Sequence, residues 1–241
     1  MSRLTSSMGS LGLLFVLIVL AWDVGTARSD NKWGPHVEIL AEPGSERTRG
    51  QKDLFIPLWQ NENALFFTDL RSSYDDDENI AGSFGLGYRR MCCGWIWGGY
   101  GYFDITRSDE YSKDHTFLGG VLGVEAMNED WDFRVNGYIS EDDEKSQPEF
   151  SRAVVSGNSI HIENGIERGL HGLDAEIGWR LPFAADCCFW DTRVFVGGYY
   201  FDADHVADLT GPQLRLETRL YDLPYMTEGS RLTLGAGYRW D

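Results

Sequence analysis

Apolar and polar residues alternate with a period of two along most of this chain. In the final stretch "GSRLTLGAGYRWD", Leu232, Leu234, Ala236, Tyr238 and Trp240 fall on one side of the alternation. The same pattern recurs at 79–90, 131–140, 172–181 and 213–222. Side chains of a β-strand point alternately to its two faces. No comparable stretch has the helical period, so the sequence predicts an all-β protein.

The pattern divides the chain into about twelve strands. Their ranges are roughly 34–41, 50–58, 64–72, 79–90, 95–105, 115–126, 131–140, 154–163, 169–180, 191–202, 211–222 and 230–240. Short connections such as "QNEN", "MCCG" and "MNED" alternate with longer polar ones, which is typical of an antiparallel up-and-down β-barrel. The eighth strand, 154–163, has the weakest pattern. A parity argument favours it, because an even number of strands is needed to leave both termini in the periplasm.

The N-terminus predicts export. Arg3 precedes the apolar run "LGLLFVLIVLAW" from Leu11 to Trp22, and "VGTARSD" then offers small residues at Gly25 and Ala27. This arrangement is typical of a secretory signal peptide cut near Ala27. We therefore expect residues 1–27 to be a signal peptide and residues 28–241 to be the barrel, with no passenger domain.

Composition excludes one class of partner. The 241-residue chain has 38 Asp and Glu against 21 Lys and Arg, a formal net charge of −17. No basic stripe could neutralise phosphates, so we expect no nucleic-acid partner. Mean hydropathy is −0.33, but a membrane barrel carries only half of its strand residues apolar, and this value is compatible with one.

Alternation alone leaves two barrels open. A soluble, lipocalin-like barrel that binds a small apolar ligand turns its apolar face inward, whereas a membrane barrel turns that face to lipid. The polar face here combines full charges with many glycines, as expected for a narrow polar lumen. The predicted lumen-lining charges are Arg89, Arg134, Asp174, Glu176, Arg180, Arg215, Glu217, Arg219, Arg231 and Arg239.

Aromatic residues favour the membrane alternative. They crowd the ends of the predicted strands, where amphipathic rings form the two girdles of an outer-membrane barrel. The chain also ends on an aromatic-tipped strand, which suits the closing strand of such a barrel. We expect Tyr238 and Trp240 to act as the signal read by the barrel-assembly machinery, although the trailing Asp241 departs from the usual aromatic last residue.

Several segments resemble the β-domain of inverse autotransporters, the intimin and invasin family of outer-membrane adhesin anchors. They are "FGLGYRR" followed by "GWIWGGYGYFD", "LGGVLGVEAMNEDWDFRVNGYIS", "ERGLHGLDAEIGWRLPF" and "GPQLRLETRLYD", within residues 64–241. The resemblance implies a twelve-stranded bacterial outer-membrane barrel whose pore holds the linker of a secreted passenger. Because the sequence stops at Asp241, we expect a stand-alone anchor or narrow pore, with any passenger supplied by a separate chain.

The cysteines form two vicinal pairs, Cys92–Cys93 and Cys187–Cys188, without the spacing of a zinc or thioredoxin-like site. The strand list places the first pair in a periplasmic turn and the second in an outer loop. Because a disulfide needs its Cα atoms within about 7 Å, pairing across the membrane would be impossible. Each pair could then close as a strained vicinal disulfide, stay reduced or bridge to another chain.

Little in the sequence indicates catalysis, a metal or a cofactor, and we expect none of the three. The five histidines are scattered, and no G-x-S-x-G is present. The runs "YDDDEN" and "SEDDE" could bind divalent cations, but solvated loops are the simpler interpretation. The stretch "FDADHVAD", with Asp202, Asp204 and His205, only loosely imitates the rim site of a barrel hydrolase.

Overall fold

A computed structural model gives the fold of the chain. It describes residues 13–23, 33–43, 48–76, 79–108, 115–141, 144–146, 148, 151–156, 159–163, 165–185, 189–204, 208–221 and 230–240. For 13–23, 152–156, 159–163 and 184–185 it describes the backbone alone.

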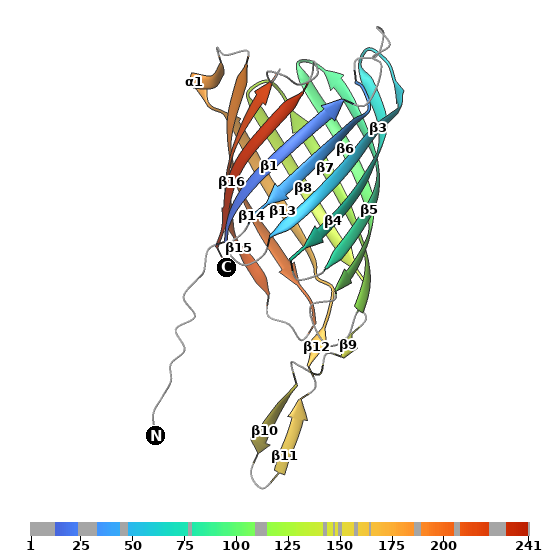
Figure 1. Ribbon diagram of the computed structural model, residues 1–241, viewed down its shortest axis with the longest axis vertical. Coiled ribbons are helices and arrows are strands. Elements are labelled where there is room, and N and C mark those ends of the chain that lie inside the picture. The colour runs from blue at the N-terminus through green and yellow to red at the C-terminus, as the bar shows by residue number, and fades with distance from the viewer. Residues whose placement is uncertain are drawn as a thin grey trace.

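Twelve antiparallel strands form one closed barrel, shown in Figure 1. Around the barrel their order is β1-β16-β15-β14-β13-β8-β7-β6-β5-β4-β3-β2. Their bounds are β1 Leu13–Asp23, β2 His36–Glu42, β3 Arg49–Gln60, β4 Ala64–Asp75, β5 Ile80–Cys92, β6 Trp95–Ser108, β7 His115–Met127, β8 Trp131–Ser140, β13 His171–Arg180, β14 Trp190–Asp202, β15 Leu209–Tyr221 and β16 Arg231–Arg239. The prediction of an antiparallel barrel of about twelve strands is confirmed.

The predicted eighth strand is wrong. Residues 154–163 do not enter the barrel; β10 (Arg152–Ser156) and β11 (Ser159–Glu163) pair with each other as a separate hairpin below it (Figure 1). A second small pair, β9 (Lys145–Ser146) with β12 (Ile166–Glu167), lies between that hairpin and the barrel. The weak alternation at 154–163 therefore belongs to a long connection from β8 to β13.

The twelfth position of the barrel is filled by β1, which pairs with both β16 and β2. This strand lies inside the predicted signal peptide. With β1 the strand count is even, and Leu13 lies opposite Arg239 at one rim. The parity argument fails for a chain that begins at residue 28: the last residues of β16 lie at the same rim as the long β8–β13 connection, and the start of β2 lies at the opposite rim (Figure 1). We call these two ends the long-loop rim, where β4, β6, β8, β14 and β16 end, and the short-turn rim, where β3, β5, β7, β13 and β15 end.

Local sequence explains the short turns. Asn61 Oδ1 accepts hydrogen bonds from the backbone N–H groups of Asn63 and Ala64 at 2.9 and 2.8 Å. Asn128 Oδ1 accepts from the backbone N–H groups of Asp130 and Trp131 at 2.9 and 2.7 Å. Both are Asx-turns, in which the side chain of asparagine accepts hydrogen bonds from the backbone that follows it. These contacts fix where β3 and β4, and β7 and β8, reverse direction.

The β5–β6 turn has a different chemistry. Cys93 and Gly94 both have positive φ, 56° and 78°. Two successive residues with positive φ are the mark of the type I′ hairpin turn, which matches the twist of the flanking strands. Position 93 thus holds a residue with a side chain in the left-handed region, where Asn or Gly is more usual.

The outer face of the barrel is apolar. Leu122, Val124, Ile139 and Val196 expose 65, 60, 61 and 56% of their surface. Near the short-turn rim the rings of Trp97, Trp95, Phe133, Trp131 and Trp179 form a continuous row with centroids 6.0–6.3 Å apart. An outward apolar band bordered by aromatic rings is what a lipid bilayer requires.

The helical content is small. The four-residue α1 (Pro182–Ala185) precedes β14 at the short-turn rim. Among the described residues, no helix has the length and apolar character needed to cross a membrane.

Candidate functional site

The lumen is built on glycines covered by aromatic rings. On β5, an added Cβ at Gly85 would lie 2.2 Å from the Tyr102 ring, and one at Gly87 would lie 2.2 Å from the Phe67 ring. The register puts each glycine directly opposite its ring on the neighbouring strand. Gly178 and Phe195 repeat the arrangement on β13 and β14. These glycines leave the space in which inward rings lie flat against the wall.

Arginines stack on the same rings from the lumen side. The guanidinium carbon of Arg71 lies 4.3 Å from the centroid of Tyr102. The corresponding distances are 4.9 Å for Arg89 over Phe67 and 3.9 Å for Arg215 over Phe195. Each stack therefore has three layers: a glycine in the wall, an aromatic ring and a cation. Cation–π attraction and the flat wall hold the arginines in place.

Carboxylates then pair with the stacked arginines. Arg89 Nε donates to Glu125 Oε1 at 2.5 Å, and the side chain of Glu125 is only 2% exposed. Arg134 lies 3.5 Å from Asp132 and 4.0 Å from the second oxygen of Glu125. The lumen charges of β5, β7 and β8 are thus compensated by one another.

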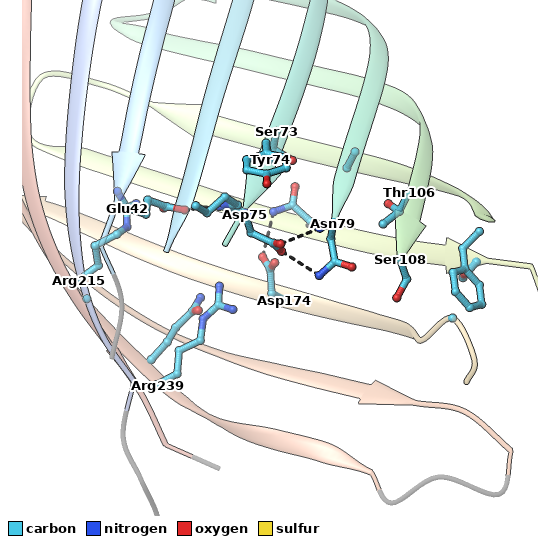
Figure 2. Close-up of a pocket in the computed structure, with 18 of the residues that line it drawn as sticks. Glu42, Ser73, Tyr74, Asp75, Asn79, Thr106, Ser108, Asp174, Arg215 and Arg239 are labelled. Atoms are coloured by element: carbon cyan, nitrogen blue, oxygen red, sulfur yellow. Dashed lines mark hydrogen bonds and ion pairs between the residues drawn. The ribbon is translucent and has the colours of Figure 1, made fainter. Parts of the chain in front are cut away.

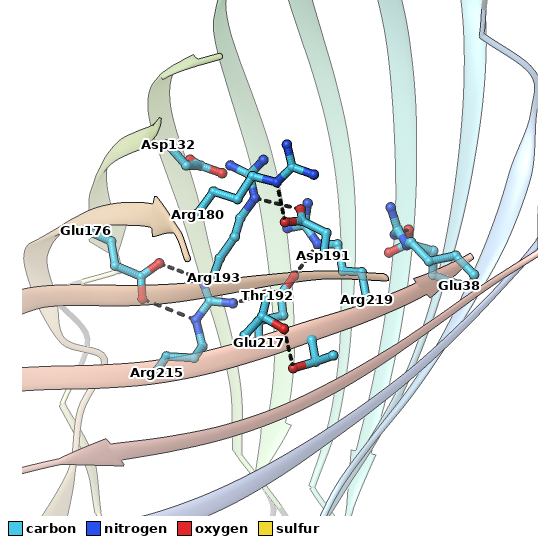
Figure 3. Close-up of polar contacts among 12 residues, drawn as sticks. Glu38, Asp132, Glu176, Arg180, Asp191, Thr192, Arg193, Arg215, Glu217 and Arg219 are labelled. Atoms are coloured by element: carbon cyan, nitrogen blue, oxygen red, sulfur yellow. Dashed lines mark hydrogen bonds and ion pairs between the residues drawn. The ribbon is translucent and has the colours of Figure 1, made fainter. Parts of the chain in front are cut away.

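A second network occupies the wall formed by β13, β14 and β15 (Figure 3). The Asp191 carboxylate bridges Arg180 and Arg193, with both Nε–O distances 3.0 Å. Figure 3 shows the neighbouring group, in which Arg215 holds Glu176 through two hydrogen bonds of 2.7 and 3.2 Å.

Glu217 closes that second network. Its carboxylate, 8% exposed, accepts from Arg215 and, at 2.5 Å, from Arg219 Nε. The paired arginines thus shield the carboxylates of both networks, while Arg89 and Arg134 themselves keep about a third of their side-chain surface exposed. We call the residues of the two networks the charge plug: Arg89, Glu125, Asp132, Arg134, Glu176, Arg180, Asp191, Arg193, Arg215, Glu217 and Arg219.

The remaining predicted lumen charges have other partners. Arg231 on β16 pairs with Glu38 on β2. Both residues lie opposite Ala21 of β1 in the register, so this ion pair spans β1. Asp174 accepts from Tyr138 and Asn136 at 2.5 and 2.9 Å. Arg239 lies 5.6 Å from the Tyr199 ring.

Sequence reasoning missed four of the eleven plug residues: Glu125, Asp132, Asp191 and Arg193. Glu125 and Asp191 were not among the predicted charges, although each carries a central carboxylate. The alternation holds the signal for Glu125, which shares its strand face with Gly119 and Gly123. Asp191 was harder to find because the residues that precede β14 do not alternate.

An apolar cluster lies near the short-turn rim. Leu65, Phe67 and Phe55 are 0, 3 and 9% exposed, and Trp33 packs against them. The backbone of Trp33 is fixed by two hydrogen bonds with the Gln60 side chain, of 3.0 and 2.9 Å. The segment before β2 thus contributes a ring to the inside of the barrel.

The other half of the lumen is hollow. A cavity of about 1250 Å³ lies toward the long-loop rim (Figure 2). Ser73, Thr106, Asn136 and Gln213 are among the polar residues that line it, and Arg134 and Glu176 of the charge plug lie at its inner end. In Figure 2 Asp75 faces Asn79 at the wall, where the carboxylate accepts from the amide nitrogen at 3.1 Å. We call this cavity the vestibule.

The predicted assembly residues lie beside the vestibule. The Tyr238 and Trp240 rings contact each other edge to face, with centroids 4.4 Å apart. The Trp240 carbonyl accepts from Tyr199 at 3.0 Å, and this contact crosses Gly211, which has no side chain to block it.

The first cysteine pair lies in the β5–β6 turn at the short-turn rim. Cys92 lies opposite Trp95, and the register continues through Met127 to Trp131 and Trp179 at the same barrel end. β13 ends and β14 begins at that same end, whereas the predicted strand list put the connection between them at the opposite rim. Cys187 and Cys188 themselves lie outside the described residues.

In the first pair the thiols are free and their Sγ atoms lie 3.1 Å apart. The hydrogen bond with Cys92 and the charge of that neighbour raise the pKa of the Cys93 thiol. Within the described part of the chain, no three His, Cys, Asp or Glu residues come together as a metal site. Asp202 and Asp204 are described, but His205 of the same stretch is not.

Comparison with known proteins decides the family. A family model described as the inverse autotransporter β-domain matches residues 35–199, more than half of the chain. This chain belongs to the inverse autotransporter β-domain family. The sequence-based resemblance is therefore confirmed, and the family places the chain in the bacterial outer membrane as a barrel of the translocator and anchor class. No curated protein matches the chain.

Similarity to one solved membrane-protein structure supports the fold, and two further structures are less similar. A chain from a study of the in-meso crystallization of membrane proteins is 14% identical, with a TM-score of 0.51 over 93% of this β-domain and 83% of that chain. OprD of Pseudomonas aeruginosa is 8% identical, with a TM-score of 0.41 over 96 and 92%. The translocator domain of NalP from Neisseria meningitidis is 10% identical, with a TM-score of 0.35 over 99 and 90%.

The outward apolar band and the family together exclude the soluble, ligand-binding alternative, since that barrel would need the opposite orientation of every strand.

Proposed function

We propose that this β-domain is a non-enzymatic outer-membrane anchor with a sealed lumen. The charge plug supports the proposal most directly. Its central carboxylates, Glu125, Asp191 and Glu217, are 2, 7 and 8% exposed and each contacts at least one arginine. Water and ions can cross only where such pairs leave a continuous path, so a packed, charge-compensated level conducts at most a small ion current.

Conductance across a planar lipid bilayer tests the seal. The native barrel is expected to show little current. The double variant Arg89→Ala/Glu125→Ala removes both partners of a plug contact and leaves neither charge unpaired. It is expected to conduct several times more than the native protein.

A second ion pair supplies the matched control. Arg49 and Glu42 pair beside the vestibule, outside the plug. The variant Arg49→Ala/Glu42→Ala should leave the current unchanged. A native barrel that conducts like an open porin would refute the sealed-anchor proposal, as would equal currents from the two double variants.

The division of the chain is part of the same proposal: residues 1–27 as signal peptide and 28–241 as barrel. β1 lies in the first part, and β2 and β16 are both antiparallel to it. Without β1 these two strands are parallel to each other and must pair directly to close the barrel. The Arg231–Glu38 ion pair already joins them on the lumen side.

N-terminal sequencing of protein from outer membranes tests this division. A first residue near Arg28 supports it. A first residue upstream of Leu13 contradicts it and makes β1 a permanent strand.

One partner assignment completes the proposal. Tyr238 and Trp240 would be read by the barrel-assembly machinery. Replacing both aromatics with Ala should lower the amount of barrel in the outer membrane. An unchanged amount would contradict the role of these residues in assembly.

A further inference from the structure

The tip of the β5–β6 hairpin carries two adjacent thiols that take no part in the lumen. Both Cys92 and Cys93 are exposed, and their Sγ atoms lie 3.1 Å apart. The type I′ turn at Cys93 and Gly94 fixes the backbone between the strands. The tip lies at the short-turn rim, next to Trp95 of the aromatic row. Two sulfur atoms are therefore held side by side in contact with solvent.

Geometry disfavours a disulfide within this pair. Successive Cα atoms across a trans peptide are about 3.8 Å apart, whereas ordinary disulfides join Cα atoms about 4.4–6.8 Å apart. A bond between adjacent cysteines is strained, and strain makes a disulfide easier to reduce. In an oxidising compartment this pair keeps its thiols more readily than well-separated cysteines do.

Adjacent exposed thiols can chelate one ion. A thiolate binds a metal ion at about 2.3 Å, so a linear two-coordinate ion needs its two sulfur atoms about 4.6 Å apart, and rotation of the exposed side chains must widen the present Sγ–Sγ separation of 3.1 Å. A site for zinc needs four ligands, and in the described residues no third His, Cys, Asp or Glu joins the pair. A site with two thiolates as its ligands favours a soft metal ion, and Cu(I) is the biological example.

We propose that Cys92 and Cys93 form a two-sulfur site for a soft, thiophilic metal ion of the Cu(I) type. Each thiol loses its proton to water as its sulfur–metal bond forms, and neither the metal nor the sulfur changes oxidation state. The turn fixes the backbone of both ligands before the ion arrives, so binding has only their side chains to order. The site is separate from the lumen and does not depend on the seal.

Anaerobic titration tests the site. The folded barrel in detergent competes for Cu(I) with a chromophoric chelator, and one tightly bound ion per chain is expected in the Cys187→Ser/Cys188→Ser background, where Cys92 and Cys93 are the remaining cysteines. Cys92→Ser and Cys93→Asn should each weaken binding by about 100-fold or more, because the second sulfur acts at high effective concentration. Asn tolerates positive φ, so Cys93→Asn keeps the turn. A band shift on boiling in SDS shows that each variant is folded.

The second cysteine pair provides the control. Cys187→Ser/Cys188→Ser should retain the Cu(I) site with unchanged affinity. The proposal is overturned if that variant abolishes binding, or if either single variant at 92 or 93 binds as tightly as the native barrel. The proposal is also overturned if Cys92 and Cys93 form a disulfide in protein isolated from membranes. Such a disulfide would show as a mass lower by two hydrogens and as no reaction of this pair with a thiol reagent after unfolding.

Discussion

Gly87→Ala should destabilise the barrel because the lumen wall has no room for one added methyl group. The new Cβ would lie 2.2 Å from Cζ of Phe67 and 2.7 and 2.8 Å from two further ring atoms. The ring cannot move aside freely. Phe67 is 3% exposed, the Phe55 ring lies 4.8 Å from it, and the Arg89 guanidinium lies 4.9 Å from its centroid.

The expected loss follows from the cost of overpacking, about 1–3 kcal/mol. With a urea slope of about 2 kcal/mol per M, the unfolding midpoint of the barrel in detergent falls by about 1 M. Gly82→Ala on the same strand is the matched control, because its nearest neighbour is a carbonyl oxygen 4.0 Å away. Neither glycine has positive φ, so Gly82→Ala is expected to be neutral or stabilising by up to about 1 kcal/mol.

A smaller side chain opposite the new methyl group should restore part of the loss. Adding Phe67→Leu to Gly87→Ala is expected to give a coupling free energy of about 1 kcal/mol in a double-mutant cycle. Equal midpoints for Gly87→Ala and Gly82→Ala, or additive effects in the cycle, would refute the three-layer description of the wall.

Two further predictions concern contacts inside the barrel. Glu125→Gln should lower the free energy of unfolding by about 3–5 kcal/mol in the same urea assay, because it leaves Arg89 and Arg134 without their shared carboxylate. A loss no larger than the loss on breaking an exposed ion pair would contradict the shielding of Glu125. Tyr199→Phe should cost about 0.5–1.5 kcal/mol, since it removes the 3.0 Å hydrogen bond to the Trp240 carbonyl. The loss is measured by heating the barrel in SDS and following its change of mobility on a gel with temperature. Tyr200→Phe is the control, because the Tyr200 hydroxyl lies on the exposed face.

The strands themselves were predictable. Eleven of the predicted ranges correspond to barrel strands. A strand with one face to lipid and the other to a polar lumen has a period-two pattern, and this pattern can be recognised within the strand's own sequence. The turns at Asn61 and Asn128 were also readable, since asparagine closes such turns with its own side chain.

The sequence pattern led to a wrong prediction at two segments. Residues 154–163 alternate, yet five residues of pairing on each side make a hairpin outside the barrel. The run from Leu13 to Trp22 is apolar throughout, which indicates a leader, but the backbone of β1 pairs with β16 over nine residues. In both cases pairing with distant strands decides the position, and a local pattern does not contain that information.

The sequence by itself determined the fold class, the outward face and the family, because alternation, aromatic placement and the Gly-rich motifs are local properties of the chain. Only the tertiary structure decided which charges meet. Arg89 and Glu125 lie on strands separated by β6, and Arg231 and Glu38 lie at nearly opposite ends of the chain. Partners of this kind depend on the register between strands, and a shift of one residue would turn every one of these side chains to the other face.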